Sequence, residues 1–287
     1  MTSLRETVEL PDAVRRLLRH RLSSSDLELP FLPTTSAEVM AMCNDESCDA
    51  RRLSETVQRD QTLAAYVLRV SNSAAYAPKE PIVSLQQAIS RLGLSVICEI
   101  AIAVSLKGRV FEVPGHQVKI REMWMHSAAA GVYAREVART VRHNVEGAYM
   151  CGLLHDVGKP LVMQVLIDVA KKRTDRPVPA GILEGAMDEF HQALGARLAE
   201  HWALPEWVAE AVANHHDYKG ANLYAKEAMI TCLADKLAHW ALDESLDDSD
   251  FEAEDPVIDD LGLYGDDLVR LFAYREQAID VAASFLL

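Results

Sequence analysis

The stretch Cys151-Gly-Leu-Leu-His-Asp-Val-Gly-Lys-Pro160 decides the expected fold, because it ends an apolar segment in a histidine–aspartate pair. His155 and Asp156 are adjacent, and Lys159 follows one helical turn later. Neighbouring residues on a helix point about 100° apart, so the pair cannot occupy one narrow face. It can flank a metal centre only if other segments supply further ligands. The chain offers His126, His191, His215, His216 and Asp235.

The composition favours helices and limits the classes of partner. Alanine, leucine and valine are abundant and aromatic residues make up only 6% of the 287 residues, which favours helix over sheet. The formal net charge of −14 excludes a general nucleic-acid binder or a binder of anionic membranes. A local basic pocket for a small phosphorylated ligand stays compatible with it.

The cysteines and the apolar runs indicate a cytoplasmic protein. The five cysteines are odd in number and form no Cys-x-x-Cys pair, as expected in a reducing compartment. Charged residues interrupt the start of the chain where a signal peptide would be apolar. No uncharged apolar run approaches the roughly 20 residues of a membrane span. We therefore expect no membrane association.

Helical spacing of apolar residues recurs along the whole chain and predicts an all-α, multi-helical bundle. We expect a helical N-terminal extension at 1–26 and a helical subdomain at 27–112. A second helical subdomain at 113–287 carries the candidate metal site. It includes an acidic loop at 243–260, in which ten of eighteen residues are acidic, and a final amphipathic helix at 268–286. The acidic composition predicts a solvated, mobile loop.

The candidate ligands suit transition metals. Imidazoles and carboxylates together favour Fe, Mn, Zn, Co or Ni, whereas Mg prefers oxygen ligands. The seven groups suffice for one ion, or for two ions that share Asp156 and keep positions open for water and substrate. Such ions activate water for attack on phosphorus. Lys159 lies four residues after His155 and can hold a phosphate oxygen, so Asp156 and Lys159 are the candidate catalytic residues.

A structural role is the alternative for each of these residues. Taken singly, a histidine is more often a core or surface residue than a ligand. Asp156 alone could be a turn residue, Asp235 a helix-surface charge and Lys159 a solvated side chain. The joint pattern favours a metal site, because both His155-Asp156 and His215-His216 end apolar helices. The remaining histidines are assigned to the core or the surface: His20, His116, His143, His201 and His239.

Beyond these spacings, the chain resembles known families. Leu153-Leu-His-Asp-Val-Gly-Lys159 is similar to the signature of the HD superfamily of metal-dependent phosphohydrolases. Further segments resemble the HDOD domain, the HD-related output domain of bacterial signalling proteins. They are Leu29-Pro-Phe-Leu-Pro33, Asp60-Gln-Thr-Leu-Ala64, Arg69-Val-Ser-Asn-Ser-Ala-Ala-Tyr76, Ile82-Val-Ser-Leu-Gln-Gln-Ala88, Leu92-Gly93, Phe190-His-Gln-Ala-Leu-Gly195 and Trp202-Ala-Leu-Pro-Glu206.

This resemblance implies an N-terminal HDOD helical subdomain followed by an HD-like helical core. It also implies the metal-ligand set of HD-GYP phosphodiesterases at the seven residues named above, with Lys159. The Gly-Tyr-Pro triplet of those enzymes is absent, because Asp217, Tyr218 and Lys219 follow His216. The resemblance therefore implies metal binding more directly than a cyclic dinucleotide substrate.

Two functions compete at this stage. The first is a bacterial signal-transduction module that holds one or two metal ions and contacts signalling proteins through its helical N-terminal half. The second is a metal-dependent phosphohydrolase or phosphodiesterase acting on a nucleotide or cyclic dinucleotide. A sensor that binds a phosphorylated small molecule without turning it over is a third, weaker hypothesis. The HDOD resemblance favours the first, and the intact ligand set keeps the second open.

Overall fold

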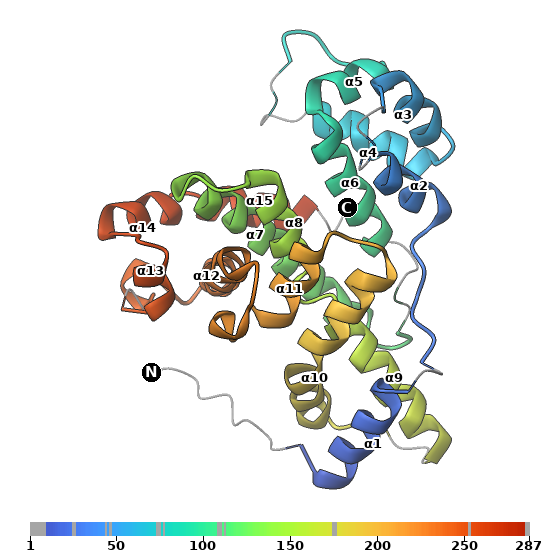
Figure 1. The fold of residues 1–287 in the computed structure, drawn as a ribbon, viewed down its shortest axis with the longest axis vertical. Coiled ribbons are helices and arrows are strands. Elements are labelled where there is room, and N and C mark those ends of the chain that lie inside the picture. Colours follow the sequence, from blue (N-terminus) through green and yellow to red (C-terminus); the bar gives the residue numbers. More distant parts are fainter. Residues whose placement is uncertain are drawn as a thin grey trace. The chain divides into compact units, whose positions relative to one another are not determined.

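The structure is a computed structural model that describes residues 10–24, 27–43, 45, 48–72, 76, 78–107, 111, 113–173, 177–251 and 254–284. Regular structure within these ranges is helical, with no strand, which confirms the predicted all-α class (Figure 1). The chain forms two compact units. Unit 1 contains Met1–Pro30 and Phe111–Leu287, and unit 2 contains Phe31–Val110. The division expected from the sequence, at 1–26, 27–112 and 113–287, stays a prediction.

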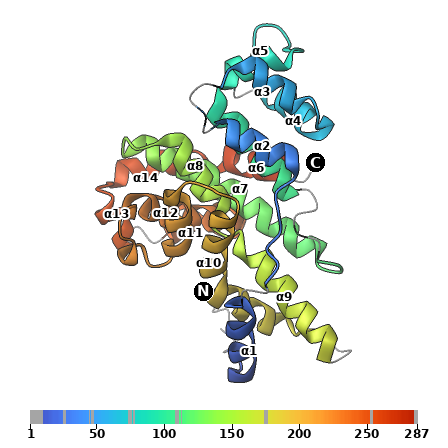
Figure 2. The ribbon, with the colours of Figure 1, turned by 45° about the vertical axis from the view of Figure 1, so that its right-hand side comes forward.

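Unit 2 is a small helical bundle around its own core. Side chains of Asp49, Asp60 and Ser84 cap helix N-termini, as their residue types favour. Gly93, with φ +83°, turns the chain between two helices bent by 111°. In Figure 2 the first and last helices of the unit lie side by side. The helices are α2 (Thr34–Cys43), α3 (Ala50–Val57), α4 (Gln61–Ser71), α5 (Leu85–Leu92) and α6 (Leu94–Lys107).

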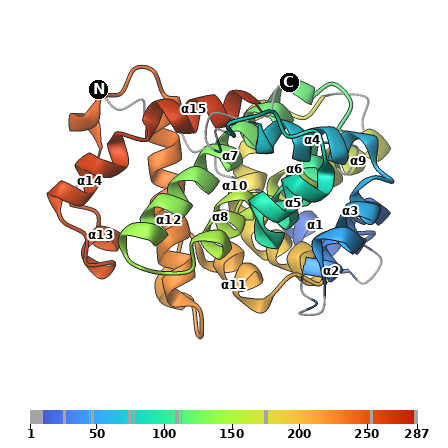
Figure 3. The same cartoon turned by 90° about the horizontal axis from the view of Figure 1, so that it is seen from above.

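Unit 1 holds the candidate site. Its helices are α1 (Asp12–Leu22), α7 (Gln117–Thr140), α8 (Val145–Leu154), α9 (Gly158–Arg173), α10 (Ala180–His201), α11 (Glu206–Asn214), α12 (Ala225–Leu242), α13 (Pro256–Asp260), α14 (Gly265–Phe272) and α15 (Arg275–Ser284). Helix α7 packs against α8 and α12 (Figure 3), and α10 packs against α9 and α11 (Figure 1). Helix α1 contacts α9 (Figure 2). Every candidate ligand lies in this unit.

Glycines let these helices approach closely. A Cβ at Gly158 would lie 2.0 Å from the carbonyl oxygen of His191, on α10. A Cβ at Gly152 would lie 2.6 Å from the carbonyl oxygen of Ala130, on α7. Only glycine fits at both points. The two glycines of the stretch Cys151–Pro160 therefore serve helix packing around the His155-Asp156 pair.

The C-terminal region differs from its prediction. A single amphipathic helix was expected at 268–286, of which residues 285 and 286 lie outside the described residues. Up to Ser284 the structure has two helices, α14 and α15, separated at Ala273 and Tyr274. Arg275 lies over the Trp240 ring, 4.5 Å from its centroid, and donates to backbone carbonyls of residues 240–246. These contacts to α12 and the loop after it, together with packing of Phe272 on Trp240, stabilise the break. Helical periodicity carries no signal for them.

The described residues of the acidic segment, 243–251 and 254–260, are also more ordered than their composition indicates. They contain a 3-10 turn at Asp248–Asp250 and helix α13, with Asp247 and Asp255 as N-caps. Val257 and Ile258 are buried in the core of unit 1. The carboxylates therefore cap helices while the few apolar residues anchor the segment.

Candidate metal centre

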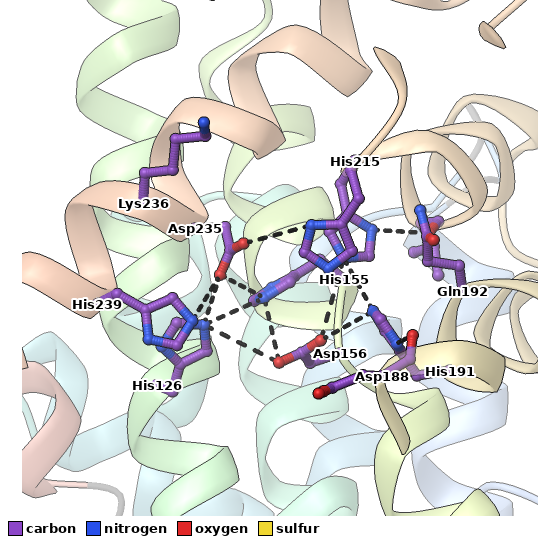
Figure 4. A network of polar contacts seen from close by, with 12 residues as sticks. His126, His155, Asp156, Asp188, His191, Gln192, His215, Asp235, Lys236 and His239 are labelled. Atoms are coloured by element: carbon purple, nitrogen blue, oxygen red, sulfur yellow. Dashed lines mark hydrogen bonds and ion pairs between the residues drawn. The ribbon is translucent and has the colours of Figure 1, made fainter. Parts of the chain in front are cut away.

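The candidate ligands come from six parts of unit 1. His126 lies on α7, His155 is the C-cap of α8, and Asp156 lies in the turn before α9. His191 lies on α10, and His215 is the C-cap of α11, followed by His216. Asp235 lies on α12. The fold brings all seven together, and Figure 4 shows their side chains pointing toward one another, except for His216, which it does not label.

One half of the cluster contains His126, His155 and Asp235. His126 Nε2 lies 2.9 Å from Asp235 Oδ1 and 3.2 Å from His155 Nε2. His155 Nε2 lies 3.4 Å from Asp235 Oδ1. All three residues are buried. Their potential ligand atoms lie within 4.8 Å of one another, which suits a single ion.

The other half contains His191, His215 and His216. His191 Nε2 and His215 Nε2 are 3.2 Å apart, and both residues are almost fully buried. His216 is half-exposed, and its Nδ1 lies 3.9 Å from Asp235 Oδ2. These three residues also offer ligand atoms within 4.8 Å of one another.

Asp156 lies between the two halves (Figure 4). Its Oδ2 is 3.4 Å from His155 Nε2 and 3.9 Å from His126 Nε2. Its Oδ1 is 3.5 Å from His191 Nε2 and 4.0 Å from His215 Nε2. Each carboxylate oxygen therefore faces a different set of imidazoles, which is the arrangement of a bridging carboxylate.

Backbone carbonyls fix the tautomers of three histidines. Nδ1 of His155 lies 2.7 Å from the oxygen of Gly152, and Nδ1 of His215 lies 2.8 Å from that of Val212. His191 Nδ1 likewise lies 2.8 Å from the backbone oxygen of Met187. A carbonyl only accepts, so each Nδ1 carries the hydrogen and each neutral ring directs the lone pair of Nε2 into the cluster. A hydrogen bond from the ring nitrogen that faces away from the cluster to a backbone carbonyl is typical of metal-bound histidines.

These tautomers test whether the residues fit a metal. His191 Nε2 and His215 Nε2 face each other at 3.2 Å with lone pairs only, which is repulsive without a cation. Two nitrogens bound at about 2.1 Å to one ion would lie at a similar separation. In addition, Asp156 Oδ1 is buried without a hydrogen bond. The donor set therefore fits a transition-metal ion.

The local charges keep three of the ligands, His191, His215 and Asp156, in the form that binds a metal. Burial lowers the pKa of His191 to about 4 and that of His215 well below its usual value, so both rings are neutral. Burial would raise the pKa of Asp156, but His155 and Lys159 hold it well below the usual range. Burial would lower the pKa of His155, but Asp156 and Asp235 raise it to about 10. Metal binding through His155 Nε2 therefore requires the loss of a proton from that ring.

Lys159 and a cavity lie beside the cluster. Lys159 Nζ donates to Asp156 Oδ2 at 2.6 Å, so in this structure the lysine is the counter-ion of the bridging aspartate. A cavity of about 550 Å³ opens next to it. Its lining includes the cluster residues His126 and Asp156, the lysines Lys119 and Lys159, and the acidic residues Glu122, Glu184, Asp188 and Glu189. The cluster is therefore reachable by a small molecule.

His239, which was assigned to the core or the surface, is an exposed residue that lies beside the cluster. Its Nε2 lies 3.4 Å from Asp235 Oδ1. Its ring centroid is 4.2 Å from that of His126. The available signal was its spacing, since a residue four positions after Asp235 on a helix shares its face.

Comparisons with known proteins show the family of this chain. The HDOD domain family matches residues 29–218, which is about two thirds of the sequence. The chain belongs to the HDOD domain family. An uncharacterized protein of Treponema pallidum (strain Nichols) is 24% identical over 197 residues, which cover 66% of this chain and 38% of that protein. Ribonuclease Y of Mycoplasma genitalium is 29% identical over 113 residues, which cover 39% of this chain and 18% of that enzyme. This HDOD chain thus matches well under half the length of either curated relative.

Solved structures share the HDOD fold. A predicted metal-dependent phosphohydrolase from Shewanella amazonensis SB2B has a TM-score of 0.73 at 19% identity, and the match covers 96% of this chain and 100% of that one. An HDOD domain protein with unknown function from Geobacter sulfurreducens has a TM-score of 0.67 at 20% identity, with coverage of 96% and 97%. A predicted signal transduction protein from Marinobacter aquaeolei VT8 has a TM-score of 0.68 at 22% identity, with coverage of 98% and 68%. At these identities the likeness concerns the fold alone.

Proposed function

We propose that this HDOD protein is a bacterial signal-transduction module that holds one or two divalent transition-metal ions. The observation that carries the proposal is Asp156, whose two oxygens face two separate sets of imidazoles. One set, with Asp235, would hold a first ion, and the set around His191 would hold a second. Family membership and the signal-transduction name of a structural neighbour support the regulatory role.

The donor set favours Fe, Mn, Zn, Co or Ni over Mg, because most of the groups are imidazoles. The protein's part is to supply these ligands in fixed orientation. The backbone carbonyls of Gly152, Met187 and Val212 orient three rings. Lys159 balances the charge of Asp156 and orients that carboxylate.

Hydrolysis of a phosphate ester is the second candidate function, and the cavity beside the cluster favours it. When bound, the ions would supply Lewis acidity and an activated water for attack on phosphorus. Lys159 lines the cavity, so its ammonium group would attract and position a phosphate oxygen. Asp156, which also lines the cavity, would hold the ions. The phosphohydrolase name of one structural neighbour agrees with this alternative.

The two functions are separated by metal-loaded wild type and Asp156→Ala in a panel of phosphate monoesters and diesters. A signalling module predicts that neither protein hydrolyses any compound above the rate of buffer. A phosphohydrolase predicts turnover by wild type alone. Equal, measurable turnover by both proteins would come from a contaminant and would remove the enzyme alternative.

We further propose that the protein acts in the cytoplasm and contacts a signalling partner through unit 2. By length and composition Val145–Lys172 could cross a membrane, but 78% of its most apolar window is buried inside the fold and a turn interrupts it after Leu154. In unit 2, Lys79 and Arg91 line an open pocket on the surface beside α5. Replacing both with glutamate should abolish capture of the partner in a pull-down and leave the metal content unchanged. Retained capture would remove unit 2 as the contact.

A further inference from the structure

His239 extends the cluster on the side of α12. It lies four residues after Asp235, on the same face of the helix, and its Nε2 is 3.4 Å from Asp235 Oδ1. That oxygen already has His126 Nε2 at 2.9 Å and His155 Nε2 at 3.4 Å. Three imidazole nitrogens thus converge on a single carboxylate oxygen, whose lone pairs accept about two hydrogen bonds. Nitrogen and oxygen atoms are expected to crowd together in this way when they all bind one cation.

The ring packing repeats between the two halves. The centroids of His126 and His239 are 4.2 Å apart with an interplanar angle of 35°. The centroids of His215 and His216 are 4.1 Å apart with an angle of 47°. In each pair one ring is buried and the other is partly exposed, at 59% for the side chain of His239 and 47% for that of His216. His239 therefore lies beside His126 in the first half of the cluster as His216 lies beside His215 in the second half.

We propose that His239 is a further nitrogen ligand of the ion held by His126, His155 and Asp235. This inference rests on the proposed metal centre. It gives that ion three imidazoles and two carboxylates, a shell that favours Fe, Co, Ni or Zn over Mg or Ca. His239 also lines the cavity, together with His126 and Asp156, so the ligand shell itself forms part of the cavity wall.

The competing role for His239 is a hydrogen bond alone, in which its Nε2–H donates to Asp235. Glutamine at this position keeps an N–H donor on a flexible side chain but is a poor metal ligand. His239→Gln therefore separates coordination from orientation. His20 is an exposed histidine on α1 outside the cluster, and His20→Gln is the matched control.

In the test, the whole chain is treated with a chelator and titrated with Co²⁺ in a calorimeter, which gives the affinity. X-ray absorption of the bound metal then gives the number of imidazoles per Co²⁺. For His239→Gln we expect affinity for one Co²⁺ to fall by about tenfold or more. We also expect the number of imidazoles per Co²⁺ to fall, while His20→Gln matches wild type in both measurements. Wild-type affinity and imidazole number in His239→Gln would overturn the inference. Absence of Co²⁺ binding by wild type would instead overturn the proposed metal centre.

Discussion

At the scale of single residues, the side chain of Asp156 connects the two halves of the cluster. It is buried, it pairs with Lys159 through Oδ2, and its Oδ1 has no hydrogen bond. Burying a carboxylate oxygen without a partner costs free energy that a bound cation recovers. Its position thus indicates a metal-binding role more directly than its pairing with lysine does.

Asp156→Asn tests this role with almost no change in shape. We expect metal affinity to fall by roughly tenfold or more, because one negative charge and one ligand oxygen are lost. Equilibrium dialysis followed by elemental analysis measures the change. Asp266→Asn, at an exposed carboxylate on α14, is the control and should bind as wild type does. Unchanged affinity in Asp156→Asn would exclude a bridging role.

Gly158→Ala tests the close approach of α9 and α10. The new methyl group would lie 2.0 Å from the carbonyl oxygen of His191, so the two helices must move apart. We expect the free energy of unfolding to fall by about 1–3 kcal/mol in urea denaturation. Gly265→Ala meets nothing within 4 Å and should change stability little. Equal stability of the two variants would contradict the packing described here.

The candidate ligands could be picked from the sequence because histidine–aspartate and histidine–histidine pairs interrupt apolar helices. The roles of Gly158 and His239 could not be predicted in this way. The role of Gly158 depends on which backbone segment packs against it, and the periodicity of the sequence carries no information on that. The proximity of His239 to the cluster depends on the position of α12 relative to α7, which only the tertiary structure shows. Its spacing from Asp235 was visible, but the same spacing occurs by chance in any long helix.

At the scale of elements, the ends of two helices position the His155-Asp156 and His215-His216 pairs. His155 and His215 are both C-cap residues, at the ends of α8 and α11. There the chain leaves the helix, so the next residue can point in a new direction. This explains how adjacent residues 100° apart on a helix can serve one cluster. The sequence predicted both helix ends, whereas it missed the break between α14 and α15, which tertiary contacts of Arg275 stabilise.

The loop after His216 is held by one carboxylate. Glu210 Oε1 accepts hydrogen bonds from the backbone nitrogens of Asn222, Leu223 and Tyr224, at 2.5, 2.8 and 3.1 Å. Glu210→Ala should therefore speed hydrogen exchange at these amides by about fivefold, since each bond contributes about 1 kcal/mol. Exchange followed by mass spectrometry measures it. Glu200→Ala, at an exposed site on α10, should leave this loop unchanged. Unchanged exchange in Glu210→Ala would show that other contacts hold the loop.

At the scale of the whole molecule, the candidate ligands come from six parts of unit 1, so metal binding at the proposed centre would be coupled to folding of that unit. An ion that binds only the folded state stabilises it by about 2.7 kcal/mol at a hundred times its dissociation constant. We expect Co²⁺ to raise the melting temperature of wild type and a chelator to reverse the shift. Calorimetric scans measure both, and Asp156→Asn should show a much smaller rise. An equal rise in both proteins would indicate binding elsewhere.

The most direct measurement is elemental analysis of the full chain, purified without chelator. The structure predicts between one and two equivalents of a transition metal per chain, and a marked loss in Asp156→Asn. Less than about a tenth of an equivalent of any transition metal in wild type, persisting after incubation with Fe²⁺, Mn²⁺, Zn²⁺, Co²⁺ or Ni²⁺, would contradict the metal centre.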